Sequence, residues 1–365
     1  MGEPKSITMK LNKTNFIIGA ILALILPLVL QSFGNAWVRI ADMALIYVML
    51  ALGLNIVVGF AGLLDLGYVA FFAVGAYVYG LAASPHLTDT FPALAAMFPE
   101  GLHISLWMIL PIAAGIAGFF GMLLGAPTLK LRGDYLAIVT LGFGEIIRVF
   151  LNNLDHPVNI TNGPKGLNQI DTLKFFGINL GKPLEVLGFE VASVSLYYYL
   201  FLALVVISVV LCHRMELSRV GRAWMAIRED EIAAKAMGIN TRNMKLLAFG
   251  MGATFGGVSG TLFAAFQGFV SPESFSLMES VMIVAMVVLG GIGHLPGVIL
   301  GAVLLSALPE VLRYLAGPLQ AMTGGRLDSA ILRQLLIAVA MIVVMLLRPR
   351  GLWPAPDHGK SLKAK

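Results

Sequence analysis

The chain has 365 residues, of which 58% are hydrophobic and only 12% charged, whereas about a quarter of a soluble domain is charged. A soluble fold of this length could not bury so much apolar surface, but a bilayer removes the need for polar cover. The formal net charge of +5 does not indicate nucleic-acid binding, because the basic residues lie at the ends of apolar segments. Cys212 is the only cysteine, which excludes an intrachain disulfide or a cysteine cluster.

Apolar segments predict an all-α, polytopic transmembrane helical bundle of about ten spans, when about 20 residues are counted as one crossing. The first segment follows Lys5, Lys10 and Lys13 and could be a signal peptide, but no clear cleavage site follows it, so we interpret it as a span. We expect a single transmembrane domain over residues 1–365, with spans near residues 15–33, 40–59, 63–83, 105–128, 134–151, 195–212, 245–269, 279–293, 296–315 and 329–347.

The placement of lysine and arginine predicts the orientation of these spans. If the N-terminus is cytoplasmic, alternate crossings put Lys130, Arg132, the 213–244 loop and the tail from Arg348 on the cytoplasmic side as well. The 84–104 loop, on the opposite side, contains no lysine or arginine. Both termini are therefore expected in the cytoplasm, as an even number of crossings requires.

Two glycine-rich stretches are expected to break helices. One runs from Gly59 to Gly67 (GFAGLLDLG) and the other from Gly290 to Gly297 (GGIGHLPG). Transporters often place discontinuous helices near their substrate path. Elsewhere, small residues recur every fourth position and predict close helix packing in lipid; these are Gly252, Gly256 and Gly260, and Ala117, Gly121 and Gly125.

The expected cytoplasmic loop of residues 213–244, counted through Lys245, has seven basic and four acidic residues, a net charge of +3. Within it, Gly221 to Asn240 (GRAWMAIREDEIAAKAMGIN) is interpreted as one helix with an apolar face. Such a helix could fit a groove on a soluble partner and act as a lever, although an amphipathic helix lying on the membrane would have the same pattern.

Glu231-Ile232-Ala233-Ala234, followed by Gly238, resembles the Glu-Ala-Ala…Gly loop with which permeases of ATP-binding-cassette (ABC) importers dock into their ATP-hydrolysing subunits. A wider likeness covers about residues 40–353. Its segments resemble the Liv-type high-affinity branched-chain amino-acid permeases, and the blocks LRGDYLAIVTLGFGEI and REDEIAA match the M subunit. The matching segments are residues 50–80, 129–147, 221–247, 267–275 and 288–293.

This resemblance implies a permease subunit of an importer for leucine, isoleucine and valine in a bacterial inner membrane, with no catalytic residues of its own. The implied partners are a related H-type permease, two cytoplasmic ATPase subunits, which would use ATP and magnesium, and a periplasmic amino-acid-binding protein. The loops 84–104 and 152–194 match the family least, which leaves the substrate range open. The implied coupling residues are Arg228, Glu229, Asp230, Glu231, Ala233, Ala234 and Gly238.

The chain itself is expected to bind no cofactor or metal. Gly359-Lys360-Ser361 resembles the end of a phosphate-binding loop, but that motif needs a glycine where this chain has Pro354. The six histidines are scattered without the spacing of metal ligands. A membrane-embedded enzyme would need clustered acids or histidines, and the sequence contains none.

Ionisable residues inside spans are costly in lipid and are therefore candidates for function; they are Asp42, Asp65, Glu145, Arg148, Glu310 and Arg313. Their spacing predicts two ion pairs, Glu145 with Arg148 and Glu310 with Arg313. Asp65 could belong to the pathway or cap a helix, and Asn55 and Gln267 could form hydrogen bonds between helices.

The residues considered for the translocation path are Asp65, Asn55, Glu145 and Gln267. An alternative hypothesis is a secondary transporter driven by an ion gradient, for which Asp42, Asp65 and Glu145 would be the candidate ion sites.

Overall fold

The computed structural model describes residues 13–99, 101–128, 131, 133–175, 178–186, 189–322, 329–348 and 351–353. Lys130, Arg132 and the segment Gly359-Lys360-Ser361 lie outside the described residues, as does the side chain of Arg313. The predicted pairing of Glu310 with Arg313 therefore remains a prediction.

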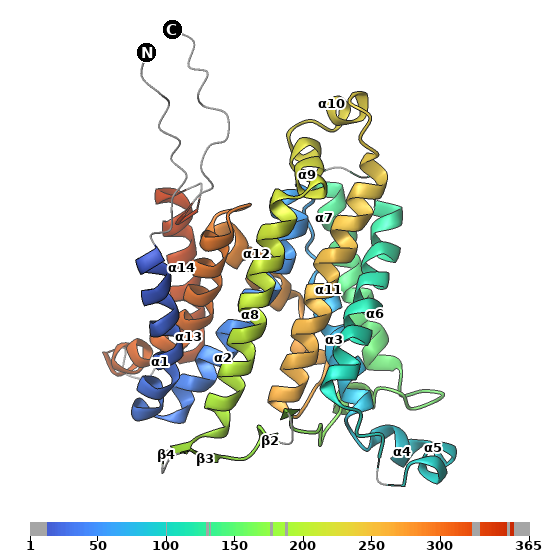
Figure 1. The fold of residues 1–365 in the computed structure, drawn as a ribbon, viewed down its shortest axis with the longest axis vertical. Coiled ribbons are helices and arrows are strands. Elements are labelled where there is room, and N and C mark those ends of the chain that lie inside the picture. Colours follow the sequence, from blue (N-terminus) through green and yellow to red (C-terminus); the bar gives the residue numbers. More distant parts are fainter. Residues whose placement is uncertain are drawn as a thin grey trace.

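A helix occupies each of the ten predicted segments (Figure 1). The observed ends differ from the predicted ones by a few residues, most at the end of α13, which extends to Met322, and at the start of α3, where Asp65 to Tyr68 form a non-helical entry. The helices are α1 (Lys13–Phe33), α2 (Asn35–Asn55), α3 (Val69–Ala82), α6 (Leu106–Thr128), α7 (Asp134–Asn153), α8 (Ser193–Leu217), α11 (Thr241–Gln267), α12 (Leu277–Gly290), α13 (Leu295–Met322) and α14 (Ser329–Leu347).

Five stretches of the described chain are long and apolar enough to cross a membrane. One of them, Asn35–Phe60, consists of α2 and the π-helical turn η1 (Ile56–Phe60) that follows it. Another, Leu295–Leu312, is the first part of α13. The other three are α6, α8 and α11, whereas α3 and α12 are shorter apolar helices. The count of ten crossings stays a prediction.

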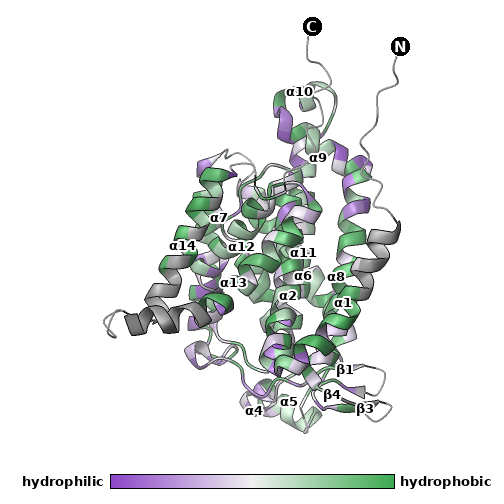
Figure 2. Ribbon diagram, turned by 90° about the vertical axis from the view of Figure 1, so that its left-hand side faces the viewer, coloured by the Kyte–Doolittle hydropathy of each residue, from purple (hydrophilic) through white to green (hydrophobic). Residues whose placement is uncertain are grey.

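The polar elements gather at the two ends of the bundle. The start of α1, the end of α14 and the short helices α9 (Arg219–Glu229) and α10 (Glu231–Ala236) lie at one end. At the other end lie α4 (His86–Thr90), α5 (Pro92–Met97) and the strands of the 171–191 region. Figure 2 shows the hydrophobic colouring concentrated in the long helices between these ends.

Two small hairpins depart from the all-α prediction. Strand β1 (Lys174–Phe175) pairs antiparallel with β2 (Ile178–Asn179), and β3 (Leu184–Val186) pairs antiparallel with β4 (Phe189–Val191). Strands of two or three residues are too short to leave a periodic pattern in the sequence, so the sequence did not predict them. The short 3₁₀ turns η2 (Gly163–Lys165) and η3 (Pro272–Phe275) were missed for the same reason.

Helix α11 lies at the centre of the bundle and packs against α2, α3 and α6. The two predicted small-residue seams, one on α11 and one on α6, are confirmed as helix contact faces. A Cβ atom on Gly252 would lie 2.5 Å from Val57, and one on Gly256 would lie 2.9 Å from Phe71. On the opposite seam, a Cβ atom on Gly121 would lie 2.5 Å from Ala253. Glycine therefore sets how closely these helices approach.

Candidate functional site

The expected coupling helix over residues 221–240 is wrong in one respect, because α9 and α10 are separate helices. Asp230 between them is extended, with φ −154° and ψ 110°. Its Oδ1 accepts hydrogen bonds from the amides of Ile232 at 2.7 Å and Ala233 at 3.0 Å. This carboxylate caps the N-terminus of α10. In a continuous helix, the Asp230 side chain could not form these bonds to the amides at the start of α10.

The coupling segment also has different limits from the predicted 213–244 loop. Residues 213–217 complete α8 and residues 241–244 begin α11, so the segment comprises residues 218–240. Ser218 caps α9 by accepting a hydrogen bond from the amide of Gly221 at 3.1 Å. After α10, Gly238 adopts φ 83°, a conformation that glycine tolerates and other residues rarely adopt.

The base of α11 holds both short helices in place. Trp224 of α9 is fully buried and its Nε1 donates to the carbonyl of Met244 at 2.7 Å. Glu231 of α10 forms ion pairs with the Nζ atoms of Lys245 at 2.8 Å and Lys235 at 3.2 Å. Burial raises the pKa of the Glu231 carboxyl, but the hydrogen bonds from the two lysines outweigh it, so the pKa is lowered.

Arg228, at the end of α9, joins the coupling segment to the first helix break. Its Nη1 donates to the carbonyl of Gly59 at 2.5 Å, in the π-helical turn that ends α2. Gly62, with φ 68°, lies over the side chain, and a Cβ atom there would come within 2.8 Å of Arg228 Cγ. A glycine at this position therefore lets the arginine reach the break.

The second break, between α12 and α13, meets the first at the same point. Asn55 Oδ1 accepts a hydrogen bond from the amide of Gly293 at 2.9 Å. A Cβ atom on Gly293 would lie 2.8 Å from Arg228 Nη1, so the guanidinium also borders this turn. We call the cluster of Arg228, Gly59, Asn55 and Gly293 the coupling junction. It connects α9 to the two helix breaks.

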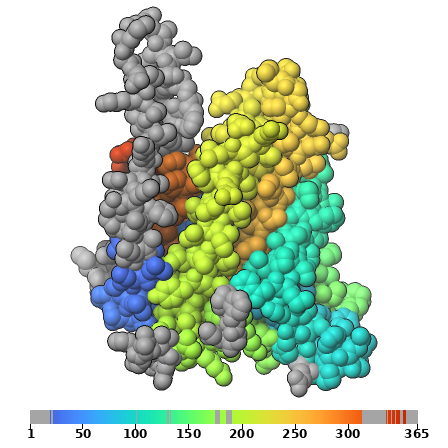
Figure 3. Space-filling model, in the orientation of Figure 1, coloured from blue at the N-terminus to red at the C-terminus, as the bar shows by residue number. Residues whose placement is uncertain are grey.

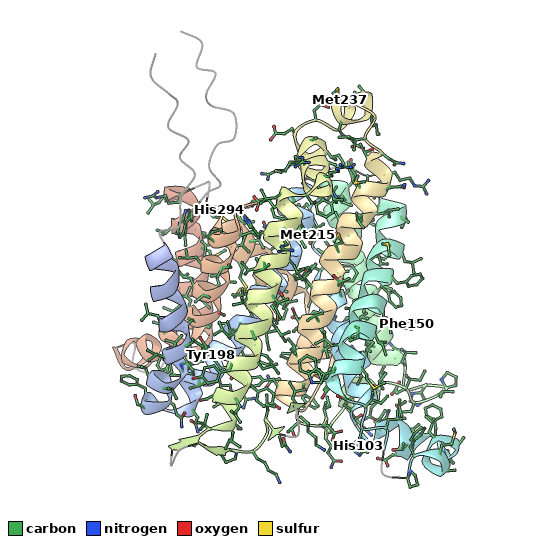
Figure 4. All side chains as sticks on the ribbon, viewed as in Figure 1. His103, Phe150, Tyr198, Met215, Met237 and His294 are labelled. Carbon is green, nitrogen blue, oxygen red and sulfur yellow. The ribbon has the colours of Figure 1, made fainter. Side chains whose placement is uncertain are left out.

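The C-terminal residues fasten onto the same turn. The amide of Leu352 donates to the carbonyl of Leu289 at 2.8 Å, and that of Trp353 donates to the carbonyl of Gly290 at 3.1 Å. His294, labelled in Figure 4, lies beside the Trp353 ring with 5.7 Å between the ring centroids. The turn between α12 and α13 is thus in contact with both residues 352–353 and Arg228.

The tip of the coupling segment exposes apolar side chains. Ile232 is 69% exposed and Met237 is 83% exposed. Met237 lies at the outermost point of α10 (Figure 4), and this tip projects beyond the surrounding helices in the space-filling view (Figure 3). Exposed apolar side chains among charged ones, on a projection that is anchored at its base, are typical of a surface that docks a partner protein.

The four residues considered for the pathway are not brought together. Asn55 belongs to the coupling junction, and the Gln267 side chain accepts a hydrogen bond from Arg39 Nη2 at 2.5 Å. Both are thus bonded between segments, as one interpretation of the sequence expected. Asp65 Oδ1 accepts from the amide of Gly67 at 2.9 Å, and the adjoining cavity of about 10 Å³ holds no more than a water molecule.

The predicted pair of Glu145 and Arg148 is confirmed. Arg148 Nε donates to Glu145 Oε2 at 3.0 Å, and Arg148 Nη1 lies 3.6 Å from Glu273 Oε2 of η3. Asp42 is fully buried, and neither of its carboxylate oxygens has a hydrogen-bond partner in the described part of the chain.

Sequence reasoning missed Trp224 and Lys245, which anchor the coupling segment. Lys245 was counted as a basic residue of the loop, although it lies near the start of a long apolar helix and is only 6% exposed. A lysine within the first turns of such a helix, close in sequence to the acidic residues Glu229, Asp230 and Glu231, was the available signal. It indicates an ion pair rather than a solvated charge.

Comparisons with known proteins give one consistent result. Residues 36–345 match the family described as branched-chain amino acid transport system / permease component. The high-affinity branched-chain amino acid transport system permease protein LivM of Escherichia coli is 41% identical over 338 residues, covering 89% of this chain and 72% of that protein.

More distant relatives cover the chain almost as fully. The probable LivM of Methanocaldococcus jannaschii is 25% identical, covering 85% of this chain and 90% of that protein. LivH of Escherichia coli is 24% identical, covering 86% of this chain and 93% of that protein. No solved structure matches. The chain belongs to the family of permease components of branched-chain amino acid transport systems.

Proposed function

We propose that this chain is the M-type permease subunit of an ATP-driven importer for leucine, isoleucine and valine. The substrate class follows from the names of the relatives, of which the LivM protein of Escherichia coli is 41% identical. The chain is also similar to LivH proteins, so the M-type and H-type subunits are built alike and can form a paired translocation path.

The observation that supports coupling to ATP most strongly is the anchored projection of α9 and α10. It presents Ile232 and Met237 to a partner, while Arg228 connects it to the breaks in the membrane helices. In this proposal two ATPase subunits bind the projection and use ATP with magnesium. This chain binds no cofactor and performs no catalysis. The exposed side chains of residues 229–238, including Glu229 and Ala233, provide the docking surface, whereas Ala234 is buried.

The arrangement of the ends supports the proposed topology. The start of α1, the end of α14 and the coupling segment lie at the same end of the bundle (Figure 1). Ten crossings with both termini in the cytoplasm would produce this arrangement in a bacterial inner membrane, with lipid around the long helices. The opposite end, with α4, α5 and the two hairpins, then faces the periplasmic amino-acid-binding protein.

The docking surface is tested with two matched substitutions. Met237→Asp puts a charge on the tip, and Met97→Asp puts one at a similarly exposed position, 72% exposed, on α5 at the opposite end. We expect Met237→Asp to lower the amount of ATPase subunit that copurifies with the permease pair at least tenfold, because burying such a side chain contributes about 1.5–3 kcal/mol. Met97→Asp should leave it unchanged. Equal retention in both variants would contradict the proposal.

A further inference from the structure

A cavity of about 440 Å³ lies between α2, α12 and α13, apart from the coupling junction. Its lining contains three acidic or basic side chains, namely Arg39 of α2, Glu279 of α12 and Glu310 of α13. The rest is largely apolar and includes Met43, Met282 and Leu305. The volume is within the range of about 300–1,000 Å³ that is common for small-molecule sites in proteins.

The charges show what the cavity can face. A charged side chain in contact with lipid hydrocarbon costs at least about 2.5–3.5 kcal/mol, and such residues normally face water, a partner group or a substrate path. Three of them around one hollow make contact with lipid tails unfavourable. Because the first turns of α2 lie at the end opposite α10 (Figure 1), the cavity belongs to the half of the bundle that faces away from the coupling segment.

Neighbouring side chains hold two of the charged groups in place. Tyr47 donates a hydrogen bond to Glu279 Oε2 at 2.9 Å. Arg39 Nη2 donates to Gln267 Oε1 at 2.5 Å, and the guanidinium lies over the ring of Phe266 at 5.3 Å from its centroid. The bond to Gln267 engages one of the five guanidinium N–H donors. The group therefore combines a fixed orientation with the donors that a carboxylate needs.

We propose that this cavity is a binding site for a zwitterionic amino acid with an aliphatic side chain. Arg39 binds the α-carboxylate, because a guanidinium offers parallel donors to a carboxylate. Glu279 and Glu310 bind the α-ammonium group. The methionine and leucine side chains contact the aliphatic part, and methionine adapts to side chains of different shape. This site deepens the proposed function, on which it rests, by naming residues that contact the substrate.

The test uses a cysteine in the cavity as a reporter of occupancy. Ser306→Cys is a mild change, because the Ser306 hydroxyl bonds, among the described residues, only to carbonyls of its own helix. The native Cys212 is fully buried and gives little background. The complete transporter, with its H-type, ATPase and binding-protein partners, is labelled in proteoliposomes with a membrane-impermeant thiol reagent. Met97→Cys is the control, exposed but outside the cavity.

We expect leucine, at ten times its apparent dissociation constant, to slow labelling of Ser306→Cys about tenfold and to leave Met97→Cys unaffected. Isopentylamine, which lacks the carboxylate, and 4-methylpentanoate, which lacks the ammonium group, should each protect much less at the same concentration. Adding Arg39→Gln should remove the advantage of leucine over isopentylamine, an effect that loss of packing alone would not produce.

Three results would overturn the site. They are no labelling of Ser306→Cys without leucine, no protection by leucine, and equal protection by both analogues. If Ser306→Cys prevents assembly, Met282→Cys takes its place, because it lines the same cavity. Uptake of labelled leucine is measured in the same vesicles. A complex that imports leucine with ATP but fails the labelling test contradicts this site alone, whereas one that shows protection but no ATP-dependent import contradicts the proposed function.

Discussion

Arg228 connects the coupling segment to the first helix break through its hydrogen bond to the carbonyl of Gly59. We predict that Arg228→Gln retains the ATPase subunits but lowers leucine uptake about tenfold or more, because a hydrogen bond to a charged group contributes about 1.5–3 kcal/mol. The measurement is the ratio of leucine imported to ATP hydrolysed. Arg222→Gln is the matched control on the same helix, since the Arg222 side chain bonds to the nearby carbonyl of Leu217 and reaches no helix break in the described part of the chain. An equal ratio of leucine imported to ATP hydrolysed in the two variants would show that the coupling junction does not link ATP hydrolysis to transport.

Glu231 gives the coupling segment a pH dependence. Its pKa in the folded protein is lowered, so its ion pairs stabilise the fold above the unfolded pKa of about 4.3 and lose that effect as the pH falls through the folded value. We predict that Glu231→Gln is less stable than the native chain at pH 7, by about 1 kcal/mol or less, since the pair is partly exposed.

This difference should shrink as the pH falls through the lowered pKa of the folded state, where the native carboxylate also becomes protonated. Thermal unfolding of the purified complex, recorded from neutral to acidic pH, measures it. Glu229→Gln, at an exposed neighbouring position, should show no such convergence. A constant gap between Glu231→Gln and the native chain would show that the ion pairs do not stabilise the fold.

At the scale of elements, the contact between α3 and α11 depends on a glycine. A Cβ atom on Gly75 would collide with the carbonyl oxygen of Gly257, whereas one on Gly115 of α6 would meet nothing within 4 Å. We predict that Gly75→Ala lowers the stability of the complex by about 1–3 kcal/mol, because the helices must separate. Gly115→Ala should not lower it, since alanine favours a helix. Thermal unfolding of both variants decides, and equal melting temperatures would refute the packing argument.

The elements also show how far the sequence predicted this structure. The apolar periods and glycine-rich breaks located the ten long helices and the two interruptions, because length and backbone freedom are local properties. The division of the predicted coupling helix into α9 and α10 was not predicted. It depends on the Asp230 side chain, which caps α10, and the sequence pattern does not show this bond. The hairpins near Lys174 and Leu184 are too short to produce a pattern.

The cavity was harder to predict than the coupling segment. Its charged residues, Arg39, Glu279 and Glu310, come from three distant segments, and only the folded bundle brings them together. One signal was present in the sequence. Arg39 begins a span at the end predicted to be periplasmic, against the usual bias of arginine toward the cytoplasm. An exception of this kind marks a residue with a specific role.

At the scale of the whole molecule, the anchored coupling segment lies at one end. The short helices α4 and α5 and the two hairpins lie at the other (Figure 1). We propose that ATP hydrolysis by subunits docked at the first end drives an amino acid through the bundle. An ion-gradient transporter would need no such projection. The energy source therefore separates the two hypotheses more directly than any single contact.

The deciding measurement is uptake of labelled leucine into proteoliposomes that contain this chain, its H-type partner, the ATPase subunits and the binding protein, with ATP on the cytoplasmic side and all ion gradients collapsed. We predict that uptake requires ATP and the binding protein together. Uptake by this chain alone, driven by a proton or sodium gradient and indifferent to ATP, would contradict the account.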